Sequence, residues 1–287
     1  MKSSYCLLTK PLILLVVLAY TSYCYSQESE ITYGAKIFSM TTIVYTYYGP
    51  ITKQASAFYY QTGKETYLVS NRHVFYSDEK FPDSIIFNLR MEDTIKKKDV
   101  WYPITVYKDF LKTNLKLHPN RKIDVASILI NDLWKQIKAP NVYRVFPVNQ
   151  PDTALINLEN PEIGDDILIV GYPKGYYDEY NLIPVMKSGI ISSFYRLDFN
   201  NLPCFLIDSR LFHGSSGSIV ISKYKPMIFS NKEPMFAIDK DFTFLGIYSG
   251  EPYLFGPRME TDEEIRFSKE YMDLGIVWYP WVLNELK

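Results

Sequence analysis

Short strand-like segments recur along most of this chain, separated by turn residues and with little helical pattern between them. Their apolar, β-branched and aromatic residues are typical of β-strands. The segments cover residues 41–48, 55–60, 67–70, 84–89, 100–106, 125–130, 166–170, 188–193, 204–207, 218–222 and 242–248. Closely spaced strands of this kind form barrels or sandwiches. The sequence therefore predicts an all-β fold, with short helices only over residues 263–272 and 280–286.

Residues 1–26 have the pattern of a secretory signal peptide. Two lysines precede an apolar stretch over residues 11–20, and the pattern places a cleavage site after Ser26. We expect the mature domain, 27–287, to be exported to the periplasm or the cell exterior. We expect no stable membrane insertion after signal removal, since no later stretch has roughly 18 consecutive apolar residues. An uncleaved anchor and a lipid attached to Cys24 are the alternatives.

Cys204 is the one cysteine of the predicted mature chain, because Cys6 and Cys24 belong to the signal peptide. The sequence therefore predicts no intramolecular disulfide. Cys204 lies in an apolar run over residues 202–207, which favours a buried and unreactive thiol.

Charge and histidine content exclude several partners and cofactors. The chain has 31 Lys and Arg against 32 Asp and Glu, a formal net charge of -1. This balance gives no electrostatic reason to expect nucleic acid or an anionic membrane surface as a partner. Three scattered histidines, without a His-Glu-x-x-His motif or a mature cysteine pair, do not indicate a zinc site. We predict no metal and no cofactor.

Three short segments supply a base, a carboxylate and a nucleophile in the order His, Asp, Ser. His73 follows an apolar strand, Asp124 precedes one, and Ser216 lies in the run Gly-Ser-Ser-Gly-Ser. A carboxylate can orient an imidazole, which then activates a serine hydroxyl for acyl transfer. Twelve other aspartates lie between His73 and Ser216. Asp124 is selected because the adjoining apolar run would desolvate its carboxylate.

Other arrangements of the same residue types do not fit the chain. An α/β-hydrolase needs its histidine after the nucleophile, but His73, His118 and His213 all precede Ser216. A subtilisin order needs an aspartate before the base, and the first aspartate is Asp78. We expect His118, on a polar loop, to be solvent-exposed and His213 to form part of a cleft wall.

Glycines flank the predicted nucleophile. Gly214 and Gly217 allow a tight turn in which the amides of Gly214 and Ser216 point at a developing oxyanion. Ser215 is the competing nucleophile, but the glycine spacing fits Ser216 better. A hairpin turn rich in Gly and Ser is the non-catalytic alternative.

These segments resemble the trypsin-like, chymotrypsin-fold serine peptidases, in particular the bacterial HtrA and glutamyl-endopeptidase branch. The likeness extends from about residue 41 to residue 250. Besides the three segments above, it includes residues 164–166 with 169–173, 188–192 and 245–250.

The resemblance implies two six-stranded antiparallel β-barrels, the first over about 35–150 and the second over about 151–275. A closing strand and a short C-terminal helix follow, with residues 278–281 packed against the second barrel. The catalytic cleft lies between the barrels, and catalysis passes through an acyl-enzyme. By the same resemblance, Tyr248, Ser249 and Gly250 line the substrate cleft. The implied function is that of a secreted serine endopeptidase acting on proteins or peptides.

Three departures from the family pattern concern activation, turn shape and specificity. Ser215 replaces the aspartate that pairs with a freed N-terminus in digestive trypsins, and Ile219 replaces the usual proline. Arg210 stands where trypsin has its specificity aspartate, so cleavage after Lys or Arg is not expected. As a hypothesis, Arg210 favours an acidic residue at the cleavage site. A catalytically silent binding protein and an esterase with the same triad remain the alternative functions.

Overall fold

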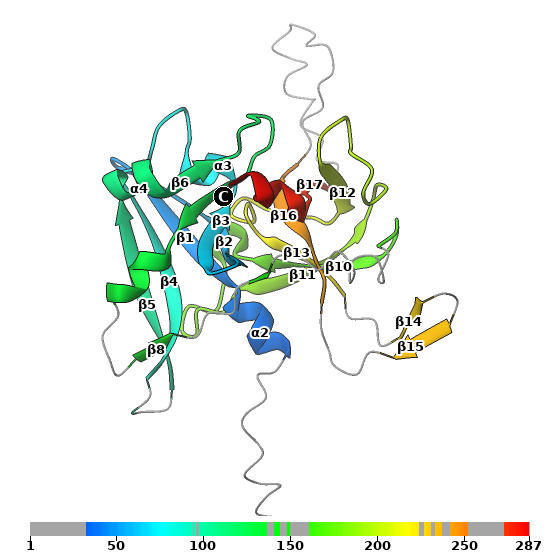
Figure 1. Cartoon of the computed structure of the whole chain (residues 1–287), viewed down its shortest axis with the longest axis horizontal. Helices are drawn as coiled ribbons and strands as arrows, with labels where there is room; N and C mark the ends of the chain where they lie inside the picture. Colours follow the sequence, from blue (N-terminus) through cyan, green and yellow to red (C-terminus); the bar gives the residue numbers. More distant parts are fainter. Residues whose placement is uncertain are drawn as a thin grey trace, which may run out of the picture.

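Two β-sheets lie side by side in the structure, a computed structural model, and the helices around them are short (Figure 1). The structure describes residues 33–93, 95, 98–136, 141–143, 148–149, 161–223, 227–230, 233–236, 242–251 and 273–286. The predicted signal peptide and the predicted helix over 263–272 lie outside these residues.

The first half is one sheet. Its strands are β1 (Thr41–Tyr48), β2 (Ile51–Thr62), β3 (Glu65–Ser70), β4 (Ser84–Asp93), β5 (Lys98–Tyr107), β6 (Leu115–Leu117), β7 (Ala126–Leu129), β8 (Asn141–Tyr143) and β9 (Val148–Asn149). They pair in the order β5-β4-β1-β2-β3-β7-β6, and β8 and β9 add to β4 and β2. The helical elements of this half are α2 (Tyr33–Ser39), α3 (Arg72–Phe75), α4 (Lys108–Asn114) and η1 (Asn131–Gln136).

The second half is a closed antiparallel barrel of six strands among the described residues. The strands are β10 (Asp166–Gly171), β11 (Val185–Ile191), β12 (Cys204–Asp208), β13 (Ile219–Ser222), β16 (Phe244–Gly250) and β17 (Leu274–Trp278). A separate hairpin consists of β14 (Met227–Ser230) and β15 (Glu233–Phe236), and the helical turns are η2 (Pro173–Gly175) and η3 (Pro280–Leu286). None of the helices in the described part of the chain has the length and hydropathy to cross a membrane.

The predicted all-β, chymotrypsin-like fold is confirmed, with one difference in the first half. The second barrel closes, but in the described residues the first sheet does not pair β5 with β7. Helix α4 and the short strand β6 come between these strands in the chain, and α4 contacts both β5 and β7. Leu111 of α4 is fully buried, so this insertion completes the core where a strand pair would otherwise close the barrel.

Side chains that alternate in direction along the inner strands divide the hydrophobic core into layers. In β2, Ala57 and Tyr59 face the core of the first half, whereas Phe58 and Tyr60 face the core between the halves. Successive side chains of a strand point to opposite faces. The continuous apolar run over 57–60 therefore serves two cores, and the same holds for β13. These two-sided strands form the junction at which the predicted catalytic residues lie.

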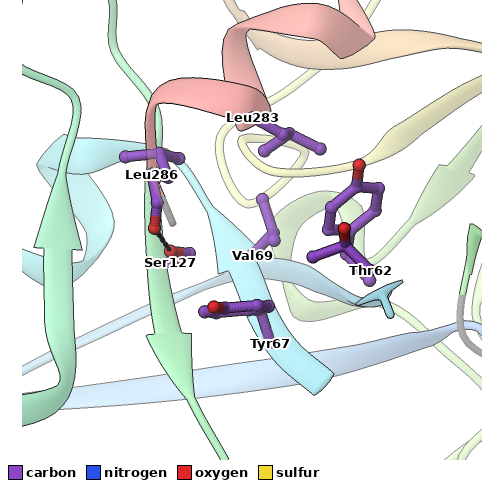
Figure 2. A pocket seen from close by; sticks show the side chains of 7 residues that line it. Thr62, Tyr67, Val69, Ser127, Leu283 and Leu286 are labelled. Carbon is purple, nitrogen blue, oxygen red and sulfur yellow. Dashed lines mark hydrogen bonds between the residues drawn. The ribbon is translucent and has the colours of Figure 1, made fainter. Parts of the chain in front are cut away.

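The final turn, η3, returns from the second barrel to the first sheet. Figure 2 shows Leu283 and Leu286 of η3 over Tyr67 and Val69 of β3, with Ser127 of β7 beside them. The Ser127 hydroxyl donates to the carbonyl of Leu286 at 3.5 Å. The two leucines are 2% and 3% exposed. The C-terminal helix, predicted over 280–286, thus holds the two halves together.

The aromatic segment over 278–281, at the start of η3, packs as predicted against the second barrel. Tyr279 is buried and stacks on Phe205 of β12, with ring centroids 5.4 Å apart. Trp281 stacks on Tyr279 from outside at 4.0 Å. Cys204, also on β12, is free and 2% exposed, which confirms the prediction of a buried thiol.

Candidate active site

His73 lies where the chain leaves the junction between the halves. Strand β3 ends at Ser70, and α3 begins at Arg72. The next two residues of α3, Val74 and Phe75, are buried and anchor this single turn. The His73 side chain is 52% exposed, so its imidazole is open to solvent while its backbone is fixed.

Asp124 holds the imidazole from the opposite loop. One carboxylate oxygen lies 2.6 Å from Nδ1 of His73, and the other accepts the backbone amide of His73 at 3.0 Å. The Asn71 side chain donates to the carbonyl of Asp124 at 2.7 Å. The neighbours Ile123 and Val125 are buried and fix the loop. This geometry leaves Nε2 of His73 free to exchange a proton.

Ser249 is a further member of the site, with a contact that the sequence did not predict. It is predicted to line the substrate cleft, but its hydroxyl donates to the Asp124 carboxylate at 2.6 Å. Its carbonyl accepts the hydroxyl of Ser216 at 3.0 Å. Ser249 therefore connects the carboxylate and the predicted nucleophile. No hydrogen bond joins Ser216 directly to His73 in the described part of the chain.

Ser216 and its neighbour Ser215 differ in accessibility. The Ser216 hydroxyl is partly buried and hydrogen-bonded. Ser215 is 1% exposed, and its hydroxyl has no partner among the described residues. A substrate carbonyl could not reach Ser215 without a change in the loop. The structure thus favours Ser216 over Ser215 as the candidate nucleophile.

Two backbone amides in the same loop have no hydrogen-bond acceptor in the described part of the chain, while their neighbours do. Among the described residues, the amides of Ser215, Gly217 and Ser218 donate to carbonyls, whereas those of Gly214 and Ser216 have no acceptor. The His213 carbonyl accepts the amide of Lys174 at 2.5 Å. Because C=O and N–H point in opposite directions across a trans peptide, this bond turns the Gly214 amide away from η2. Two unpaired donors beside a serine are what an oxyanion requires.

Gly214 is needed in this loop for its backbone conformation. Its φ is +88°, and a Cβ there would lie 2.8 Å from the carbonyl of Tyr172 and 2.9 Å from the amide of Lys174. A side chain at this position would therefore be strained and would push η2 away. The close approach of η2 sets the direction of the Gly214 amide.

The remaining predicted site residues lie around this centre. Arg210 is largely exposed, with its guanidinium 5.8 Å from the ring of Phe212 and 4.0 Å from the carboxylate of Asp273. His213 is exposed beside the loop. Tyr248 is buried, and its backbone pairs with Gly217 and Ser218. Gly250 follows a β-bulge in β16.

His118 corrects a prediction. It is expected on the surface but is 1% exposed. Its Nδ1 accepts the amide of Asn120 at 3.2 Å, and its Nε2 lies 3.5 Å from the carboxylate of Glu285 in η3. The polar composition of its loop is misleading because η3, more than 160 residues later, covers the imidazole. Among the described residues, no group of three or more His, Cys, Asp and Glu side chains could hold a metal.

Comparison with solved structures finds several bacterial proteases. A variant of the HtrA-type protease AlgW with tripeptide is 15% identical, with a TM-score of 0.47, and the match covers 88% of this chain and 60% of that one. The serine endoprotease from Yersinia pestis is 18% identical, with a TM-score of 0.44, and the match covers 87% of this chain and 62% of that one. The protease Anisep from Arthrobacter nicotinovorans is 11% identical, with a TM-score of 0.48, and the match covers 88% of this chain and 94% of that one. The chain thus spans about three fifths of the first two proteins.

No curated protein matches this chain. A family model, described as the trypsin-like peptidase domain, matches residues 55–228, which is more than half of the 287 residues. His73, Asp124 and Ser216 all lie within the matched segment. The family predicted from the sequence is confirmed by this match: the chain belongs to the trypsin-like peptidases.

Proposed function

We propose that this chain is a secreted serine endopeptidase that hydrolyses peptide bonds of proteins or peptides through His73, Asp124 and Ser216. The observation that carries the proposal is the loop over 213–216. The amides of Gly214 and Ser216 in this loop are unpaired among the described residues, and Ser216 carries a partly buried hydroxyl. Ser249 links that hydroxyl to the carboxylate that holds His73.

Acylation begins when the Ser216 hydroxyl turns from the Ser249 carbonyl toward Nε2 of His73. The hydroxyl oxygen attacks the peptide carbonyl carbon, and His73 takes the hydroxyl proton. The amides of Gly214 and Ser216 stabilise the negative charge on the carbonyl oxygen. The C–N bond then breaks, and His73 gives its proton to the leaving amine. Asp124 keeps the ring oriented and stabilises the imidazolium.

Deacylation repeats the sequence with water. His73 takes a proton from water, the hydroxide attacks the acyl carbon, and the bond to the Ser216 oxygen breaks. The proton returns to that oxygen, so the enzyme is restored and a carboxylic acid is released. An ester substrate would follow the same steps.

A fluorophosphonate probe tests whether Ser216 is activated. We expect the purified protein to be labelled, and we expect labelling to disappear in Ser216→Ala and in His73→Ala. Peptide hydrolysis should fall about 10⁴-fold or more in both. Ser188→Ala is the matched control, since Ser188 is exposed on β11, and it should label like the wild type.

Ser215→Ala separates the two candidate nucleophiles. Retained labelling in this variant supports Ser216, whereas loss of labelling in Ser215→Ala alone would contradict the assignment. A folded wild-type protein that is neither labelled nor active would instead support the catalytically silent binding protein.

Acidic substrates are a further part of the proposal. Lys174, Lys187 and Arg210 surround the ring of Phe212 at 4.6, 5.0 and 5.8 Å, four residues before Ser216. This positive charge supports the hypothesis that an acidic residue is preferred at the cleavage site. Peptides that differ only by Glu or Gln before the scissile bond test it, and equal rates would reject it.

Export through a cleaved signal peptide completes the proposal. It rests on the charged, apolar and small-residue pattern of residues 1–26. N-terminal sequencing of protein released from expressing cells should find Gln27 first. A cell-retained protein with an intact N-terminus would contradict this part of the proposal.

A further inference from the structure

Ser56 of β2 joins the first half of the molecule to the predicted oxyanion loop of the second half. Its hydroxyl donates to the carbonyl of Gly214 at 2.8 Å, and its backbone amide donates to the carbonyl of Ser216 at 2.9 Å. These carbonyls belong to the two residues whose own amides are unpaired. One residue therefore contacts both members of the predicted oxyanion hole.

The Ser56 hydroxyl is fixed by further hydrogen bonds. It accepts the backbone amide of Tyr172 at 2.8 Å and the hydroxyl of Ser218 at 3.2 Å. Ser70 donates to the Ser56 carbonyl at 2.7 Å. Ser56 is 0% exposed, so water cannot replace these bonds without a change in packing.

Space for this hydroxyl is provided by Gly171, at the end of β10. A Cβ at Gly171 would lie 2.5 Å from the Ser56 hydroxyl and 1.9 Å from that of Ser218. Two buried hydroxyls thus fill the volume that a side chain at position 171 would occupy. The hydroxyl of Ser56 is a packed part of the junction with a single orientation.

The carbonyls over 213–216 now all have donors. The His213 carbonyl accepts the amide of Lys174, and the Ser215 carbonyl accepts the amide of Ser218. Ser56 donates its hydroxyl to the Gly214 carbonyl and its amide to the Ser216 carbonyl. Four consecutive fixed carbonyls leave each peptide plane little freedom to rotate. The amides of Gly214 and Ser216 share their peptides with the carbonyls of His213 and Ser215, and Ser56 fixes the peptides next to these two. The directions of both amides are therefore fixed before substrate binds, which is how a preorganised site stabilises developing charge.

We propose that the hydroxyl of Ser56 is a positioning group for the oxyanion loop. This proposal rests on the proposed peptidase function. It adds to the catalytic residues a residue that does not touch the substrate. The carbonyl that this hydroxyl binds belongs to the peptide between Gly214 and Ser215, which joins the two peptides that carry the predicted oxyanion amides. Loss of the hydroxyl frees this connecting peptide and, through it, weakens stabilisation of the transition state, while substrate binding elsewhere in the cleft is retained.

The experiment compares Ser56→Ala with Ser127→Ala. Ser127 is also buried in the first sheet, and its hydroxyl also donates to a carbonyl, that of Leu286 in η3 rather than one in the loop. For Ser56→Ala we expect kcat to fall about ten- to hundredfold with KM changed less than about threefold. The affinity of a peptide aldehyde, whose adduct places an oxyanion in the loop, should fall in parallel. Ser127→Ala should change neither.

Stability measurements and a conservative variant keep the test decisive. If Ser56→Ala fails to fold, Ser56→Cys, which keeps a side-chain donor that is larger and weaker than the hydroxyl, should show an intermediate loss. Equal kcat and aldehyde affinity in folded Ser56→Ala and wild type would overturn the inference alone. A wild type that is neither labelled by the fluorophosphonate nor active would overturn the proposed function, and the inference with it.

Discussion

The serine hydroxyls of the site have separate tasks set by their partners. Ser216 donates to the carbonyl of Ser249, Ser56 donates to a carbonyl of the loop, and Ser249 donates to the carboxylate of Asp124. A hydrogen bond to a charged group is stronger than one between neutral groups. The Ser249 contact therefore acts on the orientation of the His73 ring through the Asp124 carboxylate that both residues contact.

Ser249→Ala tests this contact. Loss of the 2.6 Å hydrogen bond should leave the Asp124 carboxylate less well oriented and lower kcat/KM by about tenfold, which is about 1.4 kcal/mol. Steady-state kinetics on one peptide measure the change. Ser249→Thr, which keeps a hydroxyl, should recover part of the loss. A folded Ser249→Ala with wild-type kcat/KM would show that the hydroxyl has no part in orienting the base.

Burial protects the thiol of Cys204. Desolvation first, and then the negative charge of Asp198, raise its pKa from 9.0 to about 12. Since the folded value is the higher one, the thiol's contribution to stability is complete below pH 9 and is lost as the pH rises toward 12. At pH 8 the folded protein from Gln27 onward should not react with Ellman's reagent, while the urea-unfolded protein should react. Rapid reaction of the folded protein would contradict the buried thiol.

The order of motifs was sufficient to predict the residues that the structure brings together at His73 and Asp124. The roles of Ser56 and Ser249 could not be predicted in the same way. Their contacts join residues 158 and 125 positions apart, and serines in strands carry no local signal for a partner. The prediction that His118 is exposed was wrong for the same reason, because a helical turn distant in the sequence covers it.

At the scale of elements, strands with strong apolar patterns were predictable and short inserted elements were not. The prediction over 41–48 coincides with β1, and the other predicted segments each overlap a strand. Helix α4 was missed because it has seven residues, one buried side chain and no side-chain cap at its start. Strand β6 has only three residues. Such elements form through tertiary packing rather than through local propensity.

The loop between Gly214 and β13 depends on a second glycine. Gly217 has a φ of +82°, and a Cβ there would lie 2.1 Å from the Ser56 carbonyl and 2.3 Å from the Ser70 hydroxyl. Gly217→Ala should lower the free energy of unfolding by about 3 kcal/mol or more and abolish fluorophosphonate labelling.

Gly63→Ala is the matched control for this loop. Gly63 also has a positive φ, +58°, but has open space around it. Gly63→Ala should lower the free energy of unfolding by only about 1 kcal/mol, and fluorophosphonate labelling should be retained. Urea unfolding measures both variants. Equal costs for the two substitutions would mean that close packing at Gly217 does not matter.

At the scale of the whole molecule, stability depends on the contact of η3 with the first sheet. Leu286→Ala should lower the free energy of unfolding by about 2–4 kcal/mol, because it leaves a cavity over β3 and β7. Asn284→Ala, on the exposed side of the same turn, should change it by less than about 0.5 kcal/mol. Urea unfolding curves compare the two, and similar midpoints would contradict the role given to η3.

The position of η3 in the chain also has a consequence for biosynthesis. The His73–Asp124 pair forms within the first half and can assemble while the ribosome is still making the second, since domains fold as they emerge. The contact between η3 and β3 cannot form until translation has passed residue 286. We therefore expect a nascent chain to stay unable to cleave its neighbours or itself until synthesis of this fold is complete.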